Sequence, residues 1–197
     1  MDNNEILISG MVKDQTERLD KKQLKQLQSI FKPISVEKDS FFIREGDPSL
    51  QMAFIVKGLF RSFNINDQGH EITKYFYSEG ETLFSYAAYL SHTPSAYYIQ
   101  ALEDSCLLVA DITDFERIMQ GDYALLAFFK NLIDAILVRK ETHASSFKLL
   151  DSVDRYRQFQ NDFPGLEKRI KQHHLATYLG ITPVSLSRIR KKLSLIK

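Results

Sequence analysis

The stretch KQHHLATYLGITPVSLSRIRKK, residues 171–192, decides the fold of the C-terminal part of the chain. It predicts two short helices joined by a tight turn at Leu179-Gly180-Ile181, because glycine suits a helix end where the backbone becomes left-handed. Thr182 is expected to cap the second helix. Pro183 is expected at its first position, where the missing N–H costs nothing. The stretch therefore predicts a helix-turn-helix unit.

The two predicted helices have an apolar back and a polar front. The apolar stripes are Leu175, Ala176 and Leu179 on the first helix and Leu186, Ile189 and Leu193 on the second. The front of the second helix carries Ser185, Ser187, Arg188, Arg190, Lys191 and Lys192. Such a helix is suited to lie in the major groove of DNA. An ordinary helical hairpin with a solvated basic face is the alternative, and the agreement of cap, turn and stripes favours DNA binding.

Basic charge is concentrated at the same end of the chain. Residues 166–197 contain eight Lys or Arg and one acid, a net charge of +7. The remainder contains 18 basic and 24 acidic residues, a net charge of −6, so that the whole chain carries only +1. This segregation is the electrostatic footprint of nucleic-acid contact.

The composition excludes several other classes of protein. The single cysteine, Cys106, rules out an intrachain disulfide and a multi-cysteine metal or iron–sulfur site. Met1–Gly10 is polar and acidic, and no apolar run approaches the roughly 20 residues that span a bilayer. The sequence contains no Gly-rich phosphate loop, nucleophile elbow or paired His-Glu metal motif. We expect a cytoplasmic protein that is not an enzyme, holds no cofactor or metal and does not enter a membrane.

Residues 32–111 show a different pattern, in which short apolar runs are separated by turn signals. The predicted strands are 41–44, 52–56, 59–65, 71–77, 97–102 and 105–110. Many short strands at close spacing predict an antiparallel sandwich or barrel. An amphipathic helix is expected before them, over 19–31, and a loosely attached helix over 1–18.

A long uninterrupted helix is predicted over 122–150, between shorter helices at 111–119 and 153–162. At 1.5 Å per residue it would be about 43 Å long, longer than a small domain is wide, so part of it needs another partner. A homodimer through residues 122–150 provides one, whereas burial within one chain is the alternative. The series with near-heptad spacing that suits pairing is Leu125, Phe129, Leu132, Ile136, Arg139 and His143.

The order of barrel, long helix and helix-turn-helix resembles the Crp/Fnr superfamily of bacterial transcription regulators over nearly the whole length. The residues that carry the resemblance are Glu45-Gly46-Asp47, residues 54–58, Gly80-Glu81 and residues 175–191. The tail over 179–192 looks like the branch of this family found in Bacteroidetes-type bacteria. The resemblance implies a dimeric, sequence-specific DNA-binding transcription regulator. The implied partners are double-stranded DNA with an inverted repeat, a second copy of the chain, and RNA polymerase.

The resemblance also implies the fold class and the domains. The expected fold is α+β, with an antiparallel β-barrel of the double-stranded β-helix or jelly-roll type that is similar to cyclic-nucleotide-binding domains. A long dimerisation helix and a C-terminal all-α helix-turn-helix domain follow it. The expected boundaries are 1–121 for the sensor barrel with its N-terminal helix, 122–150 for the dimerisation helix and 151–197 for the DNA-binding domain.

The expected effector pocket departs from the family pattern. In relatives that bind cyclic AMP, a Gly-Glu pair holds the ribose, and an Arg-Ser or Arg-Thr pair about ten residues later neutralises the phosphate. An ungapped alignment places Phe84-Ser85 and Ser95-Ala96 at these positions, and residues 81–102 contain no Lys or Arg. Because a buried phosphate without a cation is costly, we do not expect cAMP to bind.

The side chains expected in that pocket are instead apolar, aromatic or hydroxyl-bearing. The expected pocket residues are Leu83, Phe84, Ser85, Tyr86, Ser95, Ala96 and Tyr97. They either plug the cavity or form a site for a neutral or apolar small molecule. The effector is therefore unknown from the sequence.

The resemblance assigns roles to the second helix of the helix-turn-helix. Arg188 corresponds to the base-reading arginine and is expected to contact guanine O6 and N7, with about 1–3 kcal/mol of discrimination. Many relatives have glutamate at the position of Val184. Valine cannot accept a hydrogen bond from cytosine but can touch a thymine methyl group. Ser185 is a third expected base contact. The expected phosphate contacts, which position rather than specify, are His174, Thr182, Ser187, Lys191 and Lys192.

An alternative function is a small-molecule or cyclic-nucleotide sensor whose DNA-binding end is vestigial. The sequence ends at Lys197 and leaves no room for the β-wing that follows the recognition helix in many relatives. We therefore expect the wing contacts to the DNA backbone to be missing.

Overall fold

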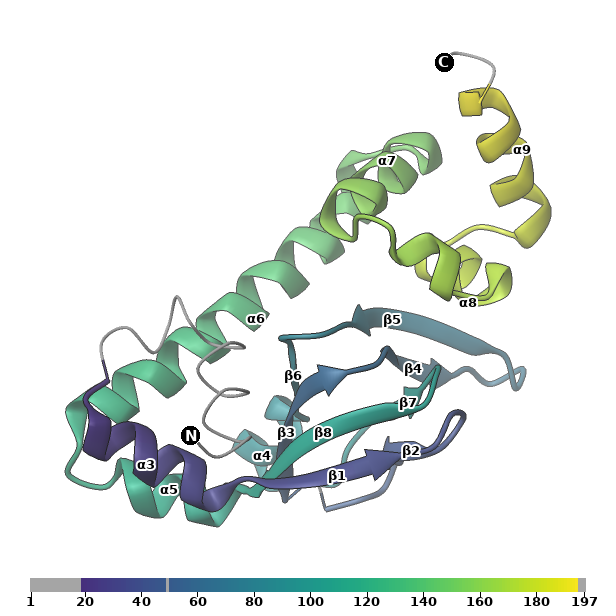
Figure 1. Ribbon diagram of the computed structural model, residues 1–197. Coiled ribbons are helices and arrows are strands. Elements are labelled where there is room, and N and C mark those ends of the chain that lie inside the picture. Colours follow the sequence, from purple (N-terminus) through teal and green to yellow (C-terminus); the bar gives the residue numbers. More distant parts are fainter. Residues whose placement is uncertain (1–18, 49, 195–197) are drawn as a thin grey trace. The chain divides into compact units, whose positions relative to one another are not determined.

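The computed structural model describes residues 19–48 and 50–194, and Figure 1 shows the order of its helices and strands. The helix expected over 1–18 lies outside these described residues. By its internal contacts the chain forms two compact units, residues 1–62 with 76–136 and residues 63–75 with 137–197. The three-part division at 121 and 150 stays a prediction about domains.

Within the described part of the chain, eight strands form two separate four-stranded sheets. The first has the order β1-β8-β3-β6 and the second the order β2-β7-β4-β5. Antiparallel sheets were expected, but the barrel is not closed, because the two sheets share no hydrogen-bonded strand. The bounds are β1 (Lys32–Val36), β2 (Phe41–Ile43), β3 (Gln51–Lys57), β4 (Phe60–Ile65), β5 (Glu71–Tyr77), β6 (Thr82–Leu83), β7 (Tyr98–Ala101) and β8 (Ser105–Asp111).

Strand β8 organises the first sheet. It pairs antiparallel with β1, where Ile34 lies opposite Leu107, and with β3, where Phe54 lies opposite Leu108. The sequence predicts six of the eight strands and misses β1 and β6. Strand β1 begins with Lys-Pro and is mostly exposed, and β6 has two residues, so neither shows the alternation that identifies a strand.

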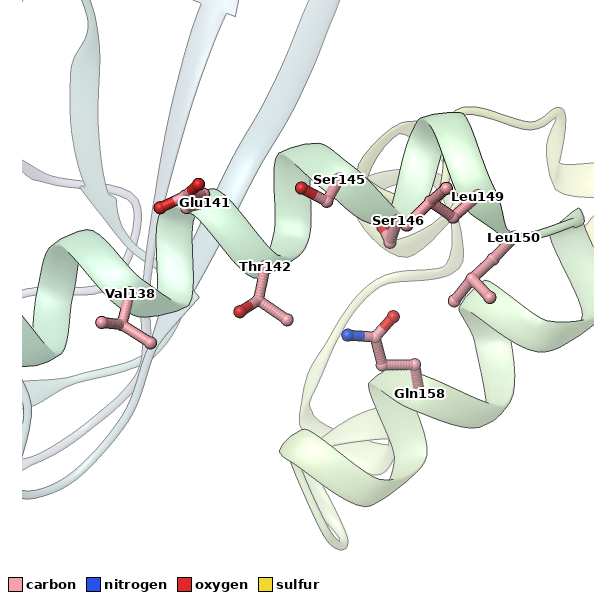
Figure 2. Close-up of a pocket in the computed structure, with 8 residues that line it drawn as sticks. All are labelled: Val138, Glu141, Thr142, Ser145, Ser146, Leu149, Leu150 and Gln158. Atoms are coloured by element: carbon pink, nitrogen blue, oxygen red, sulfur yellow. The ribbon is translucent and has the colours of Figure 1, made fainter.

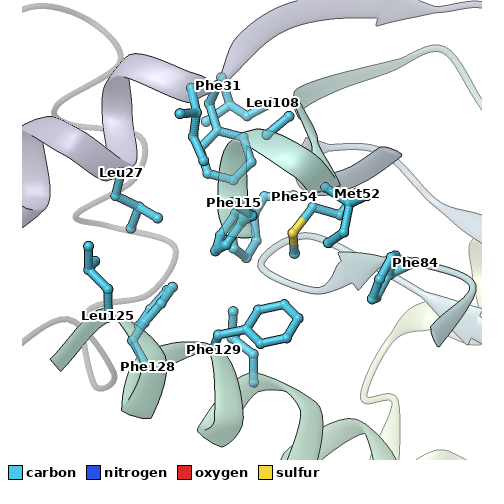
Figure 3. Close-up of a cluster of buried hydrophobic side chains, with 14 of the residues drawn as sticks. Leu27, Phe31, Met52, Phe54, Phe84, Leu108, Phe115, Leu125, Phe128 and Phe129 are labelled. Atoms are coloured by element: carbon cyan, nitrogen blue, oxygen red, sulfur yellow. The ribbon is translucent and has the colours of Figure 1, made fainter. Parts of the chain in front are cut away.

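Three helices of the first unit enclose its apolar core. They are α3 (Lys21–Ile30), α5 (Ile112–Met119) and the first half of α6 (Tyr123–Leu149). Side chains from these helices meet side chains from β3 and β8 in one buried cluster, shown in Figure 3. The labelled members are Leu27, Phe31, Met52, Phe54, Phe84, Leu108, Phe115, Leu125, Phe128 and Phe129. A short helix, α4 (Tyr86–Ser91), was not predicted.

The face of α6 that the sequence suggests for pairing with a second copy instead packs inside one chain. Leu125, Phe129 and Leu132 are 1%, 8% and 7% exposed, and all three belong to the core of the first unit. For these three residues the near-heptad spacing reflects intrachain packing. The exposed apolar side chains of α6 are Tyr123, Leu126, Leu137, Val138, Phe147 and Leu149.

The second unit has a small aromatic core. Its C-terminal helices are α7 (Ser152–Asp162), a single 3-10 turn over Leu166–Arg169, α8 (Gln172–Tyr178) and α9 (Pro183–Ser194). Asp151 caps α7 by accepting hydrogen bonds from the N–H groups of Val153 and Asp154. Phe159, Phe163 and Tyr178 are buried and lie in edge or tilted contact, with ring centroids 5.3–6.3 Å apart.

Candidate nucleic-acid interface

The turn between α8 and α9 depends on Gly180. Its φ of +68° is left-handed, and the N–H groups of Gly180 and Ile181 bond the carbonyl oxygens of Thr177 and Ala176 at 3.1 and 3.0 Å. A Cβ atom at this position would lie 2.7 Å from Cε1 of Phe147. Glycine is therefore required both by the backbone conformation and by its neighbour.

Helix α9 begins with the predicted cap. The Thr182 side-chain oxygen accepts a hydrogen bond from the N–H of Ser185 at 3.1 Å, and the Thr182 carbonyl accepts one from Leu186. Pro183 is the first residue of the helix. The hydroxyls of Thr182 and Ser185 also lie 3.0 Å apart, so one donates a hydrogen bond to the other. Local hydrogen bonds therefore determine the residue at which α9 begins.

The back of α9 is buried against its own unit. Leu186 and Ile189 are 0% and 8% exposed, and Leu175 and Ala176 of α8 are fully buried. The apolar stripes predicted from the sequence are therefore confirmed at these positions. They hold α9 by one side and leave its opposite face to solvent.

Two polar side chains on the rim of α9 are tied back to the unit. The Nε2 of Gln172 donates to the Ser187 hydroxyl at 2.6 Å and to the Pro183 carbonyl at 2.8 Å. Arg190 Nε donates to Glu167 Oε1 at 2.6 Å, and both side chains are half-buried. The sequence reading that placed Arg190 on the outward face is therefore wrong. Its charge serves an ion pair inside the unit.

The ion pair of Arg190 belongs to a wider network. The Tyr156 hydroxyl donates to Glu167 Oε1 at 2.6 Å, and Gln160 Nε2 reaches both groups. Burial, followed by the hydrogen bond to the Glu167 carboxylate, raises the pKa of Tyr156. The phenol therefore stays a donor at neutral pH, and Glu167 is held between Tyr156 and Arg190.

Four side chains remain on the front of α9. Val184 is 61% exposed, and Arg188, Lys191 and Lys192 are exposed as well. Among the described residues, the three cationic side chains have no hydrogen-bond or ion-pair partner. Val184, Arg188 and Lys191 follow one another at i, i+4 and i+7, so they form one stripe along the helix. This stripe is the surface best placed to meet an external anion.

The other expected DNA contacts lie elsewhere. His174 is 6% exposed within α8, so its ring cannot reach a phosphate without local rearrangement, and we leave it out of the proposed contact set. Thr182 and Ser187 are exposed but their hydroxyls are engaged as described. Ser185 is half-buried. Of the three expected base contacts, Val184 and Arg188 are therefore the exposed ones.

Arg155 supports the α8–α9 turn in a way that the sequence does not reveal. Its Nε donates to the Leu179 carbonyl at 3.1 Å and its Nη1 to the Leu150 carbonyl at 2.7 Å. The guanidinium lies 4.9 Å from the centroid of the Phe147 ring. One side chain thereby joins the C-terminal ends of α6 and α8, where carbonyl oxygens lack helical partners. In sequence Arg155 looks like any solvated cation of a polar helix.

His143 of α6 stacks on Tyr178 of α8. Its ring lies 4.3 Å from that of Tyr178 at an interplanar angle of 13°. Burial, and then the charge of Arg155, lower the pKa of His143. The imidazole is therefore neutral at neutral pH and acts as an aromatic packing group.

The residues expected to form an effector pocket in the first unit are bonded to one another. The hydroxyls of Ser85 and Ser95 lie 3.2 Å apart, and Ser95 donates to the Tyr97 carbonyl at 2.9 Å. The Tyr97 hydroxyl donates to the Phe84 carbonyl at 3.3 Å, and burial raises the pKa of Tyr97. Ser85, Ser95 and Tyr97 are 0%, 2% and 6% exposed. Ser85 and Ser95, the two positions expected to correspond to the Glu and Arg of cAMP-binding relatives, are thus joined by one hydrogen bond.

The remaining expected pocket residues differ in how far they are buried. Leu83 and Phe84 are buried, and Phe84 belongs to the main apolar core (Figure 3). Tyr86 is half-buried and packs against Phe84 with ring centroids 6.0 Å apart. Ala96 is exposed, so its inclusion in the pocket is wrong. Ala96 lies in a bend before β7, and the residues on either side of it, Ser95 and Tyr97, are buried.

The second sheet contains a buried cation, Arg61, which donates hydrogen bonds to Gln100. Arg61 is 2% exposed, and its Nε and Nη2 donate to Gln100 Oε1 at 3.1 and 2.7 Å. Gln100 alternates along β7 with Ile99 and Ala101, which are fully buried. Arg61 and Gln100 therefore share the face opposite to the one that Ile99 and Ala101 present to the interior.

The second unit also contains an open groove between α6 and α7, with a volume of about 510 Å³. Figure 2 shows its eight lining residues: Val138, Glu141, Thr142, Ser145, Ser146, Leu149, Leu150 and Gln158. Val138 and Leu149 are 63% and 79% exposed. The groove thus presents uncovered apolar side chains along the second half of α6.

Within residues 19–48 and 50–194, no three His, Cys, Asp or Glu side chains are grouped so that they could hold a metal ion. In the same part of the chain, no helix is long and apolar enough to cross a membrane.

Comparison with known proteins places the fold. Residues 33–122 match the family model of the cyclic nucleotide-binding domain. None of the curated proteins compared with the chain is significantly similar to it.

Solved structures of similar fold include bacterial regulators. FixK2 from Bradyrhizobium japonicum has a TM-score of 0.73 at 18% identity, with 84% of this chain and 85% of that chain covered. The c-di-GMP-responsive global regulator CLP from Xanthomonas campestris has a TM-score of 0.70 at 15% identity, with 89% and 92% covered. A proposed Crp/Fnr-family transcriptional regulator from Eubacterium rectale has a TM-score of 0.69 at 16% identity, with 90% and 84% covered. Antiparallel sheets, a long helix and C-terminal helices are therefore an arrangement that this chain shares with Crp/Fnr regulators.

Proposed function

We propose that this protein is a sequence-specific DNA-binding transcription regulator of the Crp/Fnr type, and that α8 and α9 form its helix-turn-helix. The observation that carries the proposal is that one face of α9 is buried in its own unit while the opposite face is exposed and cationic. Its apolar back is buried, and Ser187 and Arg190 are bonded within the unit. Arg188, Lys191 and Lys192 remain exposed in one cationic region. A helix anchored in this way presents its free face to a groove without losing its own contacts.

Charge supports the same assignment. The +7 carried by residues 166–197 contrasts with the −6 of the remainder, so the attraction of a phosphate backbone acts mainly on the end that contains α9. Arg190 forms an ion pair with Glu167 inside the unit. Arg188 and Lys191 are exposed and can contact DNA. Arg188 is then the base-reading residue, and Lys191 and Lys192 are phosphate contacts.

The first prediction separates base reading from phosphate contact. A DNA site is first enriched from a random double-stranded library with the full-length protein, and its Kd is measured by fluorescence anisotropy. Arg188→Ala should weaken binding to the enriched site roughly 5- to 100-fold, the range expected for a bidentate guanine contact, and should leave binding to random DNA much less affected. Lys191→Ala should weaken both and reduce the salt dependence.

Arg117→Ala is the charge-matched control, because Arg117 is an exposed cation of α5 that pairs with Asp114. It should leave both affinities unchanged. Equal losses on enriched and random DNA in the Arg188 variant would make Arg188 a phosphate contact. A library that yields no enriched sequence would contradict the proposed function itself.

The sensor unit is proposed not to bind cAMP. The serine pair at positions 85 and 95 offers neither the carboxylate that holds a ribose nor a cation for the phosphate. Both hydroxyls are buried and already bonded. A cyclic nucleotide would have to break these bonds and bury an unpaired charge. The effector, if the unit has one, would be neutral or apolar.

Two copies of the chain are proposed to act together. The exposed apolar side chains along α6 include Val138 and Leu149, which border the open groove of Figure 2. A second copy of α6 is the occupant we propose, because a twofold pair brings two α9 helices to one DNA molecule. Such a dimer reads an inverted repeat with half-sites about 34 Å apart. RNA polymerase contact remains a prediction from the resemblance.

A sensor with a vestigial DNA-binding end is the second candidate. The match of residues 33–122 to the cyclic nucleotide-binding domain favours it, because that part of the chain is the one recognised as a ligand-binding fold. The enrichment experiment distinguishes the two candidates. A vestigial end would bind DNA without sequence preference, and Arg188→Ala would then affect all DNA equally.

A further inference from the structure

Glu167 is the single acidic residue of the basic segment over 166–197. It lies in the 3-10 turn before α8, and its Oε1 accepts hydrogen bonds from Arg190 Nε and from the Tyr156 hydroxyl, both at 2.6 Å. Gln160 Nε2 donates to its Oε2 at 3.3 Å. One carboxylate therefore joins α7, the 3-10 turn and α9.

Arg190 differs from the other cations of α9 in the side of the helix from which it projects. It follows the buried Leu186 by four residues, so it lies on the side that packs on its own unit. The side chains of Arg190 and Glu167 are 31% and 25% exposed. The other three cations of α9 are exposed and, among the described residues, have no hydrogen-bond or ion-pair partner.

Two polar contacts hold α9 near its opposite ends. Near the start, Gln172 of α8 donates to the Pro183 carbonyl and to the Ser187 hydroxyl. Near the end, Arg190 donates to Glu167. Pro183 and Arg190 are about 10 Å apart along the helix axis. The Glu167 carboxylate therefore fixes the C-terminal half of α9 in addition to the contacts at its start.

The same ion pair also limits where the positive charge of α9 can act. Four of the five residues over 188–192 are cationic. A cation that contacts a phosphate strengthens binding to every DNA sequence and carries no sequence information. The guanidinium of Arg190 would add such a contact if it were free to swing outward, but Glu167 holds it inside the unit. The attraction of α9 for phosphates then comes from its front.

We infer that Glu167 is a specificity-determining residue that acts through Arg190. It is a positioning residue, because it keeps a cation of α9 away from the DNA backbone and contacts no DNA itself. The inference rests on the proposed DNA-binding function and deepens it. The quantity that Glu167 raises is the ratio of the affinity for the enriched site to the affinity for random DNA.

Glu167→Gln tests the inference, because the amide removes the charge and keeps an acceptor oxygen. The Kd of the full-length variant is measured by fluorescence anisotropy over a range of salt concentrations. The freed Arg190 should tighten binding to random DNA roughly fivefold at about 0.15 M salt and steepen the salt slope by about 0.9, the contribution of one phosphate. Binding to the enriched site should change less than about twofold, because Arg188 fixes the rotation of α9 in the groove.

Asp154→Asn is the charge-matched control. Asp154 pairs with Arg157 within α7 at 2.9 Å, so the variant makes the same change in net charge and frees an arginine that is not part of α9. It should leave the affinity ratio unchanged. Tyr156→Phe removes a hydrogen bond from the Glu167 carboxylate but no charge. It should lower the melting temperature and leave the salt slope on random DNA unchanged.

A double variant tests the state of Arg190 in the wild-type protein. Glu167→Gln combined with Arg190→Gln removes both charges and keeps the net charge of wild type, and two amides can still bond each other. It should bind random DNA with the wild-type Kd and salt slope. A salt slope reduced by about 0.9 would show that Arg190 already contacts a phosphate, and it would overturn the inference even if the single variant fails to fold.

The outcomes separate this inference from the proposed function. If a site is enriched and depends on Arg188, but Glu167→Gln weakens binding to both DNAs, the DNA-binding function stands and Glu167 serves stability alone. An equal fall of the affinity ratio in Asp154→Asn or Tyr156→Phe also overturns the role of Glu167. If no sequence is enriched, the proposed function fails first.

Discussion

At the scale of single residues, Gly180 determines how the two helices of the candidate interface are joined. Its left-handed φ allows the turn bonds of Gly180 and Ile181, and its missing side chain leaves room for Phe147. Arg155 then holds the neighbouring Leu179 carbonyl from the other side. The orientation of α9 relative to α8 therefore depends on a position where every other residue type is strained.

The prediction at this scale concerns Gly180→Ala. A non-glycine residue in the left-handed region costs about 1–3 kcal/mol, and the new Cβ would meet Phe147 at 2.7 Å. We expect a lower free energy of unfolding for the transition of the second unit, measured by urea denaturation followed by tyrosine fluorescence. Binding to the enriched DNA site should weaken as well.

Gly69→Ala is the matched control for that variant. Gly69 also has a positive φ, +79°, and belongs to the second unit, but a Cβ there would have no atom within 4 Å. It should show the backbone cost alone. Equal destabilisation by the two variants would mean that the Phe147 ring moves aside without cost. An unchanged stability in Gly180→Ala would contradict the requirement for a left-handed glycine.

Single residues also show what could be predicted from the sequence. Gly180 and Thr182 were predictable because their roles depend on neighbours within three or four residues. Arg190 was not, since its partner Glu167 lies 23 residues away and no local pattern indicates it. His174 likewise looks like a polar surface residue until the packing of α8 buries it. Periodicity identifies a face of a helix but not which polar members of that face are tied back.

At the scale of elements, the strands and helices with strong periodicity follow the sequence closely. The predicted helix over 122–150 is observed as Tyr123–Leu149, and the strand predicted over 71–77 is observed with the same bounds. What periodicity could not assign is the partner of each face. The apolar series of α6 could pack either on a second helix or in an intrachain core. Leu125, Phe129 and Leu132 pack in the core of the first unit.

The loop between β6 and β7 carries the prediction at this scale. We expect no saturable heat when cAMP is titrated into the protein in a calorimeter, and no rise in melting temperature, because Ser85 and Ser95 bond each other where relatives carry ligand groups. Ser95→Ala should lower the melting temperature, since it leaves buried partners unsatisfied at a cost of about 1–3 kcal/mol. It should still not bind cAMP. Saturable binding by wild type would show that the loop opens and supplies charge partners that its present bonds conceal.

At the scale of the whole molecule, the second half of α6 exposes apolar side chains that a partner could cover. Its first half is covered by the core of the first unit, whereas Val138 and Leu149 in its second half are largely exposed. Exposed apolar groups of this size on one helix are typical of an interface. A dimer would cover them and would place two copies of α9 at one inverted repeat, which a monomer cannot read cooperatively.

The last prediction therefore concerns assembly. Val138→Glu should shift the protein from dimer to monomer in size-exclusion chromatography with light scattering, because a buried carboxylate without a partner is costly at an apolar seam. Leu90→Glu introduces the same charge at another exposed apolar position, 57% exposed on α4, and should leave the mass unchanged. The monomeric variant should bind a single half-site as wild type does at equal subunit concentration, yet lose the extra affinity for the full inverted repeat. A dimer that survives Val138→Glu with full affinity would assign the pairing surface to another face and leave the groove between α6 and α7 without the role proposed for it.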